Sequence, residues 1–355
     1  MRSERIPPDR LLSDGESMLP GAVLLAPVRL GERTIPKGTR LDRPTAHLLR
    51  EAARAGTLDG FLRLGWPEPG DLHEDDAALR LARAVTGPGV RVGAPDQSRV
   101  ALTAEVDGVL RVRIEALGQL NRIDPLEVFT LFHGQAVRAG RVVGSVKVAP
   151  HLVAGERVEA GERVARERGP ILSVDPYLPL EVAAVAAEAL APQGLDRFDA
   201  AARMKVQALG GRFAGTASIP EPDPDQAALE LEGELRRLAL ERRVALILVG
   251  GVSAGDPLSP LYAALERLGG HLLRRGVPAH PGSMIWLAAL RDTTLLGLPQ
   301  CGMFSMATAA DLVLPRLLTG ERVTADTLAD LGHGGLLGRE MRFRFPDYAK
   351  DLDTP

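Results

Sequence analysis

The chain has 355 residues, 45% of them hydrophobic, and this length is sufficient for two domains that each bury a core. Its formal net charge of −3 provides no basic excess to follow a nucleic-acid backbone, so we expect no nucleic-acid partner. Because Cys301 is the only cysteine, an intrachain disulfide and a cysteine-based zinc site are excluded. Charges throughout the first twenty positions and the lack of a long apolar run predict a cytoplasmic protein with neither a signal peptide nor a membrane span.

The first half mixes short strands with helices, which predicts an α+β region rich in β-structure. Residues 1–18 are polar, and we expect them to be poorly ordered. Apolar runs predict strands here, and amphipathic runs predict helices. The expected elements are a strand at 22–30, a helix at 44–55 closed by Gly56, a second helix at 71–85 and further β-structure at 129–153.

Two local patterns in this half predict particular connections. The pair Asp107-Gly108 separates two alternating runs within residues 101–114, and this combination is typical of a β-hairpin. The sequence Ala-Gly-Glu-Arg-Val occurs at 154–158 and again at 160–164, from which we expect a turn-rich connection rather than a solenoid.

After Gly169, strand-like and helix-like segments alternate, which is typical of a mostly parallel sheet with helices on both faces. The predicted fold class is therefore α/β, with a three-layer αβα domain preceded by the α+β region. The expected strands are 181–187, 212–219 and 244–249, and the expected helices are 196–209 and a segment ending near 242. The predicted domains are 1–165, 166–323 and 324–355, the last made of a helix and a flexible tail from Arg342.

The most informative segment runs from Val244 to Asp256 and continues into a helix. Its apolar start is typical of a strand buried on both faces, and three glycines follow, at 250, 251 and 255. Ser259 can cap the helix and Pro260 suits its first position. Main-chain amides and the helix dipole together favour a bound anion, most often a phosphate. The alternative is an ordinary tight turn, because the segment matches neither the P-loop nor the dinucleotide fingerprint.

Two further segments have the same design. The short apolar run 293–298 precedes Pro299-Gln300-Cys301-Gly302 and a helix expected at 305–318, with Gly320 after its end. The turn 279–283 precedes the apolar run 284–290. We expect three loops to lead out of buried strands and to meet at the carboxyl edge of the sheet, where α/β proteins bind ligands. Together they favour a phosphate-bearing ligand.

These loops resemble the signature loops of a known family. Gly-Gly-Val-Ser-Ala-Gly-Asp at 250–256, Pro281-Gly282 and Gly297-Leu298-Pro299 are similar, in order and spacing, to those of molybdopterin-binding domains, including molybdopterin adenylyltransferase and molybdopterin molybdotransferase. This resemblance covers roughly residues 180–320. The segments 22–30, 35–39, 68–76 and 146–150 resemble stand-alone molybdopterin-binding proteins, whose relatives also occur fused to a cofactor nucleotidyltransferase domain.

The resemblance implies a ligand, molybdopterin or its molybdenum-loaded form, and a role for each matching residue. Asp256 would orient Mg²⁺ or a pterin nitrogen, and with Glu188 it is the implied catalytic carboxylate. A homodimer is also implied. The residues implied to bind the ligand are Gly250, Gly251, Val252, Ser253, Ala254, Gly255, Pro281, Gly282, Ser283, Gly297, Leu298, Pro299, Gln300, Cys301, Gly302 and Ser305.

The chain departs from the family pattern at three places. Family enzymes usually have Thr-Gly and an acidic residue after the first strand, where this chain has Ala186-Ala187-Glu188. Ser259 stands where a second acidic residue usually follows the one matched by Asp256. The third loop reads Gly-Leu-Pro-Gln-Cys-Gly instead of Gly-Leu-Pro-Gly-Asn-Pro. Since Mg²⁺ is usually held by carboxylates and substrate phosphates, these changes affect catalysis more than binding.

Several single residues have a structural alternative to a functional role. Cys301 could present a thiolate to molybdenum or could be a small buried residue. His280 and His333 could contact a ligand or could lie in solvated turns. The acidic group at 71–76 is most typical of a helix start in solvent.

Two classes of function remain open on the sequence, and a third is weaker. The first is a carrier or maturation factor that holds the cofactor for a molybdoenzyme or acts with a cofactor nucleotidyltransferase. The second is an enzyme that inserts molybdate into adenylylated molybdopterin with Mg²⁺. The third is a related α/β nucleotide hydrolase. Asp256 and Glu188 favour the enzyme, whereas the changes at Ala187 and Ser259 favour the carrier.

Overall fold

The computed structural model describes residues 1–13, 18–96, 98–304 and 306–350. The chain forms two compact units. Unit 1 comprises residues 1–105, 111–133 and 139–174, and unit 2 comprises 106–110, 134–138 and 175–355. Both contain helices and sheets, so the predicted α/β class is confirmed. Within the described ranges, no helix has the length and apolar character needed to cross a membrane.

The start of unit 1 is an ordered α/β substructure with its own core. Residues 2–13 form β1 and α1, so the expectation of a poorly ordered start is wrong for them. Every residue of β1 pairs with β5, and Ile6 and Leu11 are buried in the core. The elements here are β1 (Arg2–Ile6), α1 (Pro8–Ser13), β2 (Val23–Leu24), β3 (Val28–Leu30), β4 (Arg33–Ile35), α2 (Arg43–Arg54) and β5 (Leu62–Trp66).

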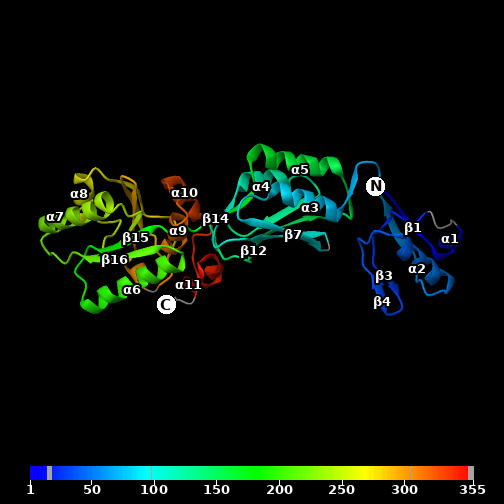
Figure 1. Ribbon diagram of the computed structural model, residues 1–355, viewed down its shortest axis with the longest axis horizontal. Helices are drawn as coiled ribbons and strands as arrows, with labels where there is room; N and C mark the ends of the chain where they lie inside the picture. Colours follow the sequence, from blue (N-terminus) through cyan, green and yellow to red (C-terminus); the bar gives the residue numbers. More distant parts are fainter. Residues whose placement is uncertain (14–17, 97, 305, 351–355) are drawn as a thin grey trace. The chain divides into compact units, whose positions relative to one another are not determined.

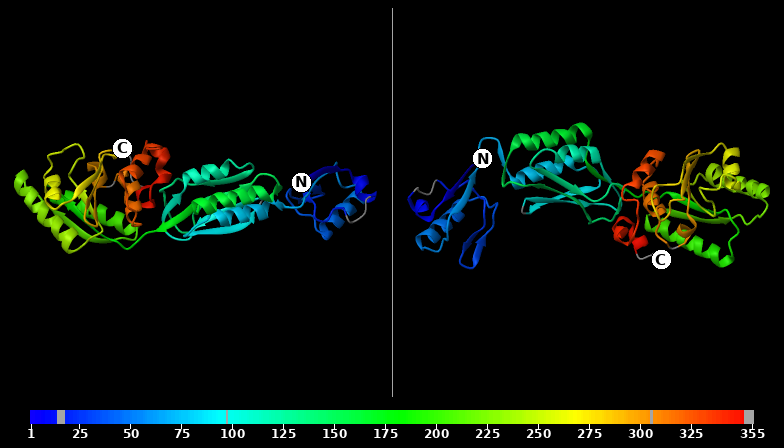
Figure 2. Two further views of the ribbon diagram at one scale, coloured as in Figure 1. Left: turned by 90° about the horizontal axis from the view of Figure 1, so that it is seen from above. Right: turned by 180° about the vertical axis from the view of Figure 1, so that it is seen from behind.

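The rest of unit 1 is a four-stranded antiparallel sheet with three helices on one face (Figure 1), an arrangement also visible in Figure 2. The strand order is β10-β12-β8-β7. The strands are β7 (Val90–Asp96), β8 (Arg99–Ala104), β10 (Leu126–Thr130) and β12 (Val142–Val148), and the helices are α3 (Glu74–Val85), α4 (Ile114–Asn121) and α5 (Gly155–Arg168). Two short strands, β6 (Asp71–His73) and β13 (Leu152–Ala154), pair with each other.

Two predicted connections in this half are wrong. The expected hairpin does not form, because β8 already has β7 and β12 on its two edges. The strand after the turn, β9 (Gly108–Val112), instead joins β11 (Ala136–Val137) and β14 (Leu172–Pro176) in a separate sheet. The repeated Ala-Gly-Glu-Arg-Val segments form helix α5 rather than turns. Its residues Val158, Gly161 and Ala165 are buried at helical spacing, which places the charged positions between them outward.

Unit 2 is built on a six-stranded mixed sheet in the order β16-β15-β17-β20-β19-β18. The first four strands in this order are parallel, whereas β19 and β18 run antiparallel to their neighbours. The strands are β15 (Glu181–Ala186), β16 (Arg212–Ser218), β17 (Leu246–Gly250), β18 (His271–Arg275), β19 (Trp286–Leu290) and β20 (Thr293–Gly297). The predicted strands 181–187, 212–219 and 244–249 therefore correspond to β15, β16 and β17.

Apolar side chains cover both faces of this sheet. On β15, Val182 and Ala184 belong to one buried cluster and Ala183 and Val185 to another, as strand alternation requires. Helices α6 and α9 contribute to the first cluster, and α7, η1 and α8 contribute to the second. These helices are α6 (Pro192–Ala208), α7 (Pro224–Leu235), the π-helical η1 (Arg236–Glu241), α8 (Pro260–Arg267) and α9 (Ala310–Leu317).

The C-terminal part of unit 2 is ordered through residue 350. We expected a flexible tail from Arg342, but Phe345 and Ala349 are buried in the first cluster of unit 2. The many charged residues of this segment made the sequence look like a solvent-exposed tail, so the buried positions of Phe345 and Ala349 were not recognised. The elements are α10 (Ala325–Ala329), η3 (Asp330–Gly332), η4 (Arg339–Arg344) and α11 (Asp347–Lys350), and residues 351–355 lie outside the described part.

Candidate functional site

Three loops meet at the carboxyl edge of the parallel strands in unit 2. The first loop, 251–256, leaves β17, and the third loop, 298–302, leaves β20 and forms the short helix η2 (Gln300–Met303). The second loop, 279–283, lies in the connection between β18 and β19, so it leaves a strand as expected, although β18 is only partly buried. Because β19 is antiparallel to β20, with Trp286 opposite Gly297, the start of β19 lies at the same edge as the end of β20.

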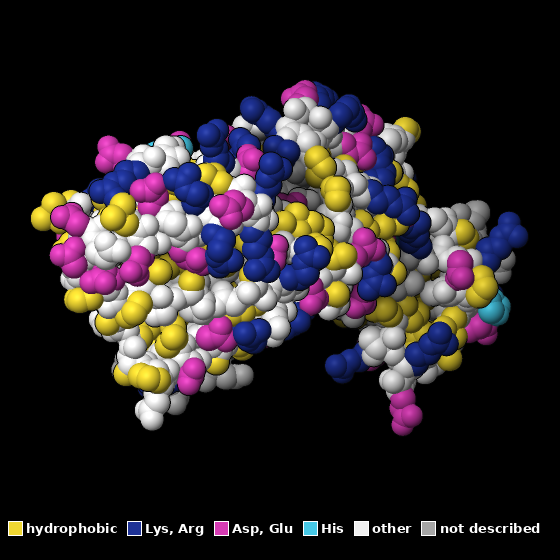
Figure 3. All heavy atoms as spheres, turned by 60° about the vertical axis from the view of Figure 1, so that its left-hand side comes forward, with side chains coloured by type: hydrophobic (Ala, Val, Ile, Leu, Met, Phe, Trp, Pro, Cys, Tyr) yellow, Lys and Arg dark blue, Asp and Glu magenta, His cyan; other side chains and the backbone are white. Residues whose placement is uncertain are grey.

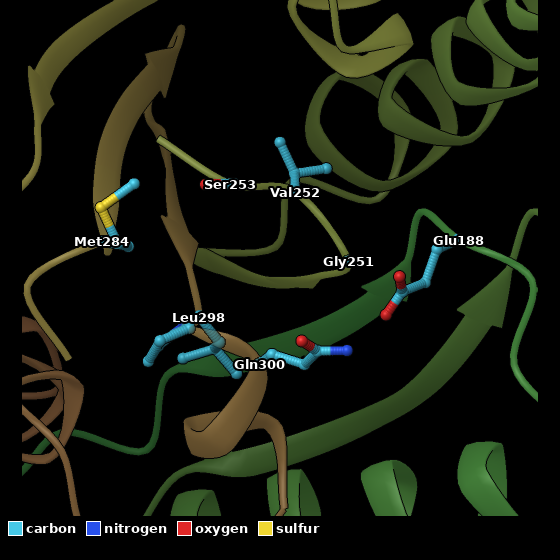
Figure 4. Close-up of a pocket in the computed structure, with 8 residues that line it drawn as sticks. Glu188, Gly251, Val252, Ser253, Met284, Leu298 and Gln300 are labelled. Carbon is cyan, nitrogen blue, oxygen red and sulfur yellow. The ribbon is translucent and has the colours of Figure 1, made fainter. Parts of the chain in front are cut away.

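A hollow of about 250 Å³ lies between the first and third loops and the segment after β15 (Figure 4). Its lining mixes main-chain atoms, apolar side chains and two polar side chains with long reach. In Figure 4 the carboxylate of Glu188 and the amide of Gln300 point toward one another across the hollow. The lining residues are Glu188, Gly251, Val252, Ser253, Met284, Leu298, Pro299 and Gln300.

Two aromatic side chains fix the first loop from below. The indole N–H of Trp286 donates to the carbonyl of Val252 at 2.9 Å, and the hydroxyl of Tyr262 donates to the carbonyl of Ser253 at 3.2 Å. The two rings are 5.5 Å apart in an edge-to-face arrangement. The phenol is protonated at neutral pH, and burial raises the pKa of Tyr262 further. The carbonyls of Val252 and Ser253 are thereby occupied within the protein.

The amides of the first loop are different from its carbonyls. Within the described part of the chain, no acceptor is found for the main-chain N–H groups of residues 251–254. Gly251, Val252 and Ser253 also line the hollow. Gly251 is half-buried, Val252 is buried and Ser253 is exposed. Main-chain N–H groups are strong hydrogen-bond donors that favour an acceptor. The first loop therefore offers successive main-chain donors beside a hollow, an arrangement that suits an anion.

Glu188 lies directly against the glycine that begins this loop. Gly251 has a φ of +82°, and a Cβ placed on it would lie 2.5 Å from Cγ of Glu188. Only glycine permits this backbone conformation and this close approach without strain. The carboxylate thus occupies the position next to the main-chain donors.

The glycines of the third and second loops have packing roles. A Cβ on Gly297 would lie 2.0 Å from the indole of Trp286. A Cβ on Gly302 would lie 2.9 Å from the hydroxyl oxygen of Thr308, and one on Gly282 would lie 2.8 Å from Cβ of the same threonine. Thr308 therefore packs between the second and third loops.

A buried ion pair lies beneath the third loop. Nζ of Lys205 in α6 is 2.9 Å from Oδ1 of Asp311 in α9, and these side chains are 3% and 1% exposed. The same Nζ donates to the carbonyl of Gly302 at 3.1 Å. A buried lysine that loses its counter-ion becomes an uncompensated charge, so this pair constrains both helices and the loop.

The structure brings seven of the predicted site residues to the hollow: Glu188, Gly251, Val252, Ser253, Leu298, Pro299 and Gln300. The others do not line it, and these are Gly250, Ala254, Gly255, Asp256, Pro281, Gly282, Ser283, Gly297, Cys301 and Gly302. Ser305 lies outside the described residues. Met284 lines the hollow but was not predicted, although its place directly after the second loop would have indicated it.

Asp256 is exposed, and its Oδ1 accepts a hydrogen bond from the amide of Leu258 at 3.0 Å. It therefore stabilises the turn that leads to α8. Among the described residues, no group of three or more His, Cys, Asp or Glu side chains is arranged to hold a metal ion. Ser259 precedes α8 as expected, but its side chain makes no capping hydrogen bond.

The remaining candidates have local structural roles or lie at the surface. The amide of His280 donates to the carbonyl of Gly335 at 2.8 Å, while its side chain is exposed. His333 is also exposed, and Cys301 is half-buried.

Comparisons with known proteins give only distant likenesses. No family model and no curated protein matches the chain. Among solved structures, it is similar to the molybdopterin biosynthesis MoeA protein from Pyrococcus horikosii, with 16% identity over 70% of this chain and 74% of that chain and a TM-score of 0.27. It is also similar to a deletion mutant of NadC, with 14% identity over 48% of this chain and 61% of that chain and a TM-score of 0.16. Scores this low carry no argument about fold or function.

We predict that Gly297→Ala destabilises the protein, because the added methyl group overlaps the rigid indole of Trp286. Overpacking of this kind costs about 1–3 kcal/mol, measured by chemical denaturation. Gly233→Ala, inside α7, is the matched control because a Cβ there meets nothing within 4 Å. It should stabilise by about 0.5–1 kcal/mol. Equal effects of the two substitutions would contradict the packing role of Gly297.

We predict that Lys205→Met lowers the free energy of unfolding by about 3–5 kcal/mol, because Asp311 is left buried without its cation. The same denaturation measurement on Arg203→Met is the control. Arg203 lies two positions earlier in α6 and pairs with Asp199 at the surface, so its loss should cost about 1 kcal/mol or less. A small loss for Lys205→Met would show that the buried pair does not constrain the fold.

Proposed function

We propose that unit 2 is a three-layer molybdopterin-binding domain, and that its hollow binds molybdopterin or the molybdenum-loaded cofactor. The observation that carries this proposal is that residues 251–253 line the hollow and that their main-chain amides lack an acceptor in the described chain. The motifs of the three loops supply the identity of the ligand. On this proposal the protein acts in biosynthesis of the cofactor or in its delivery.

The phosphate of the ligand is assigned to the first loop. Successive amides there can donate to phosphate oxygens. The carbonyls of Val252 and Ser253 are already used by Trp286 and Tyr262, so they do not compete for these donors.

The pterin ring is assigned to the space between Glu188 and Gln300, which face one another across the hollow. Glu188 lies beside Gly251, at one end of the row of amides, and would repel a phosphate that bound at that end. A pterin presents an amino group and a ring N–H that a carboxylate accepts side by side. Gln300 can both donate and accept on the opposite wall. The hollow thus combines donors for an anion with an acceptor for a guanidine-like edge.

A carrier role agrees better with this lining than catalysis does. Glu188 is the one carboxylate among the described lining residues, and Asp256 caps a turn in solvent. Mg²⁺ held by Glu188 and the ligand phosphate would neutralise charge during molybdate insertion, so the molybdotransferase remains the second candidate. The face in Figure 3 carries both acidic and basic side chains. We propose a molybdoenzyme or a cofactor nucleotidyltransferase as the partner. We also propose that the protein acts in the cytoplasm as a homodimer.

We predict that Gln300→Glu weakens binding of molybdopterin about tenfold or more, because it adds a negative charge beside an anionic ligand. Gln207→Glu makes the same chemical change at an exposed position in the last turn of α6. Equilibrium titration under anaerobic conditions should show a normal affinity for that control. If both variants bind like the wild type, the ligand is not in this hollow.

A second prediction separates the pterin from the phosphate. Glu188→Gln should weaken molybdopterin binding about tenfold because it removes the acceptor for the pterin edge. Binding of inorganic phosphate should stay equal or become tighter, since a like charge has been removed. Weaker binding of phosphate as well would place the carboxylate on a metal ion instead of the pterin.

The carrier and the enzyme differ in a single-turnover assay with adenylylated molybdopterin, molybdate and Mg²⁺. A carrier should bind the adenylylated ligand and release no adenylate above the rate without protein. Adenylate release that Glu188→Gln abolishes would establish the molybdotransferase and contradict the carrier.

A further inference from the structure

A chain of polar contacts joins the C-terminal end of unit 2 to the third loop. The hydroxyl of Tyr348 in α11 donates to Oδ1 of Asp311 at 3.0 Å. The same oxygen lies 2.9 Å from Nζ of Lys205, and that ammonium donates to the carbonyl of Gly302 at 3.1 Å. The Lys205 and Asp311 side chains are buried, so solvent cannot replace any of these partners without opening the core.

The other carboxylate oxygen of Asp311 extends the network to the second loop. Oδ2 accepts from the amide of Thr308 at 2.9 Å and lies 3.5 Å from its hydroxyl. The next amide, of Ala309, donates to the carbonyl of Pro281 at 2.9 Å. One carboxylate therefore organises the start of α9 against the second loop while its counter-ion contacts the third loop.

The C-terminal segment, residues 339–350, is attached to unit 2 independently of this network. Arg138 donates to Oδ2 of Asp347 at 3.0 Å, and Gln135 donates to the carbonyl of Phe343 at 2.5 Å. Phe345 and Ala349 belong to the buried core. Removal of the Tyr348 hydroxyl should therefore leave the segment in place and remove only the hydrogen bond to Asp311.

We propose that Lys205, Asp311 and Tyr348 are positioning residues for the ligand hollow, and that the C-terminal segment is a strap that fixes the second and third loops. Burial, with Asp311 beside it, raises the pKa of Tyr348, so the phenol remains a neutral donor to the carboxylate. The proposal that these residues position the loops rests only on the contacts described above. The expected effect on ligand binding rests on the proposed function.

The test is amide hydrogen exchange in the ligand-free full chain with Tyr348→Phe. The amides of Gly302 and Met303 donate to the carbonyl of Pro299, so their exchange reports opening of the third loop. We expect about tenfold faster exchange there, the factor that corresponds to one lost hydrogen bond, with no change in β17. Asp311→Asn should accelerate it further.

Tyr177→Phe is the matched control. Tyr177 also lies in unit 2 and packs on the same core, but its hydroxyl is not a donor to Asp311 in the described chain. Exchange in the third loop that is equal for the two phenylalanine variants would overturn the proposal. Equal acceleration in β17 and the third loop would also overturn it, because the residue would then stabilise the unit as a whole.

Binding provides a second and separable result. If the wild type binds molybdopterin, Tyr348→Phe should raise the dissociation constant several-fold, whereas Tyr177→Phe should not. If the wild type does not bind but the third loop opens faster in Tyr348→Phe, the proposed function fails and the positioning role stands.

Discussion

The site in unit 2 depends on one reversal of strand direction. Four neighbouring strands of the sheet are parallel, and the loops that leave them meet at their carboxyl edge. Since β19 runs antiparallel to β20, the loop that enters β19 is brought to that edge as well. The same pairing sets Trp286 opposite Gly297, where the lack of a side chain makes room for the indole. From there the indole N–H reaches the first loop.

The charge and hydrogen-bonding character of the hollow depends on which of its polar groups already have partners within the protein. Aromatic donors occupy the carbonyls of Val252 and Ser253, whereas the amides of residues 251–254 have no acceptor within the described chain. Glu188 supplies negative charge beside Gly251 (Figure 4), and the ligand that we propose presents both an anionic group and a hydrogen-bond donor edge. Beneath the loops, the buried pair of Lys205 and Asp311 makes their geometry dependent on the surrounding helices and on the C-terminal segment.

Much of the sheet in unit 2 could be predicted because β15, β17, β19 and β20 are mostly apolar runs, whereas β18, with three basic residues among five, was not predicted. The parallel alternation was likewise visible for β15, β16 and β17. The reversal at β19 was not, since an apolar run has the same appearance in either direction. The first half of the chain shows the complementary limit: Asp107-Gly108 is a good hairpin signal, but the two edges of β8 are taken by β7 and β12.

In the candidate site, too, features within one loop could be predicted, whereas contacts between residues far apart in the chain could not. Glycines near the hollow could be identified from the loops, but the sequence could not tell that Gly251 admits Glu188 while Gly297 admits Trp286. Lys205, Asp311 and Tyr348 are far apart in the chain and carry no motif, so only the fold brings them together. Asp256 fits the family pattern, yet its side chain serves the turn before α8.

The most direct test of ligand binding in the hollow is a crystal structure determined after crystals of the protein are soaked anaerobically with molybdopterin. The account predicts the phosphate within hydrogen-bond distance of the amides of Gly251, Val252 and Ser253, with the pterin edge on Glu188. A pterin bound elsewhere, or an empty hollow at saturating ligand, would contradict it.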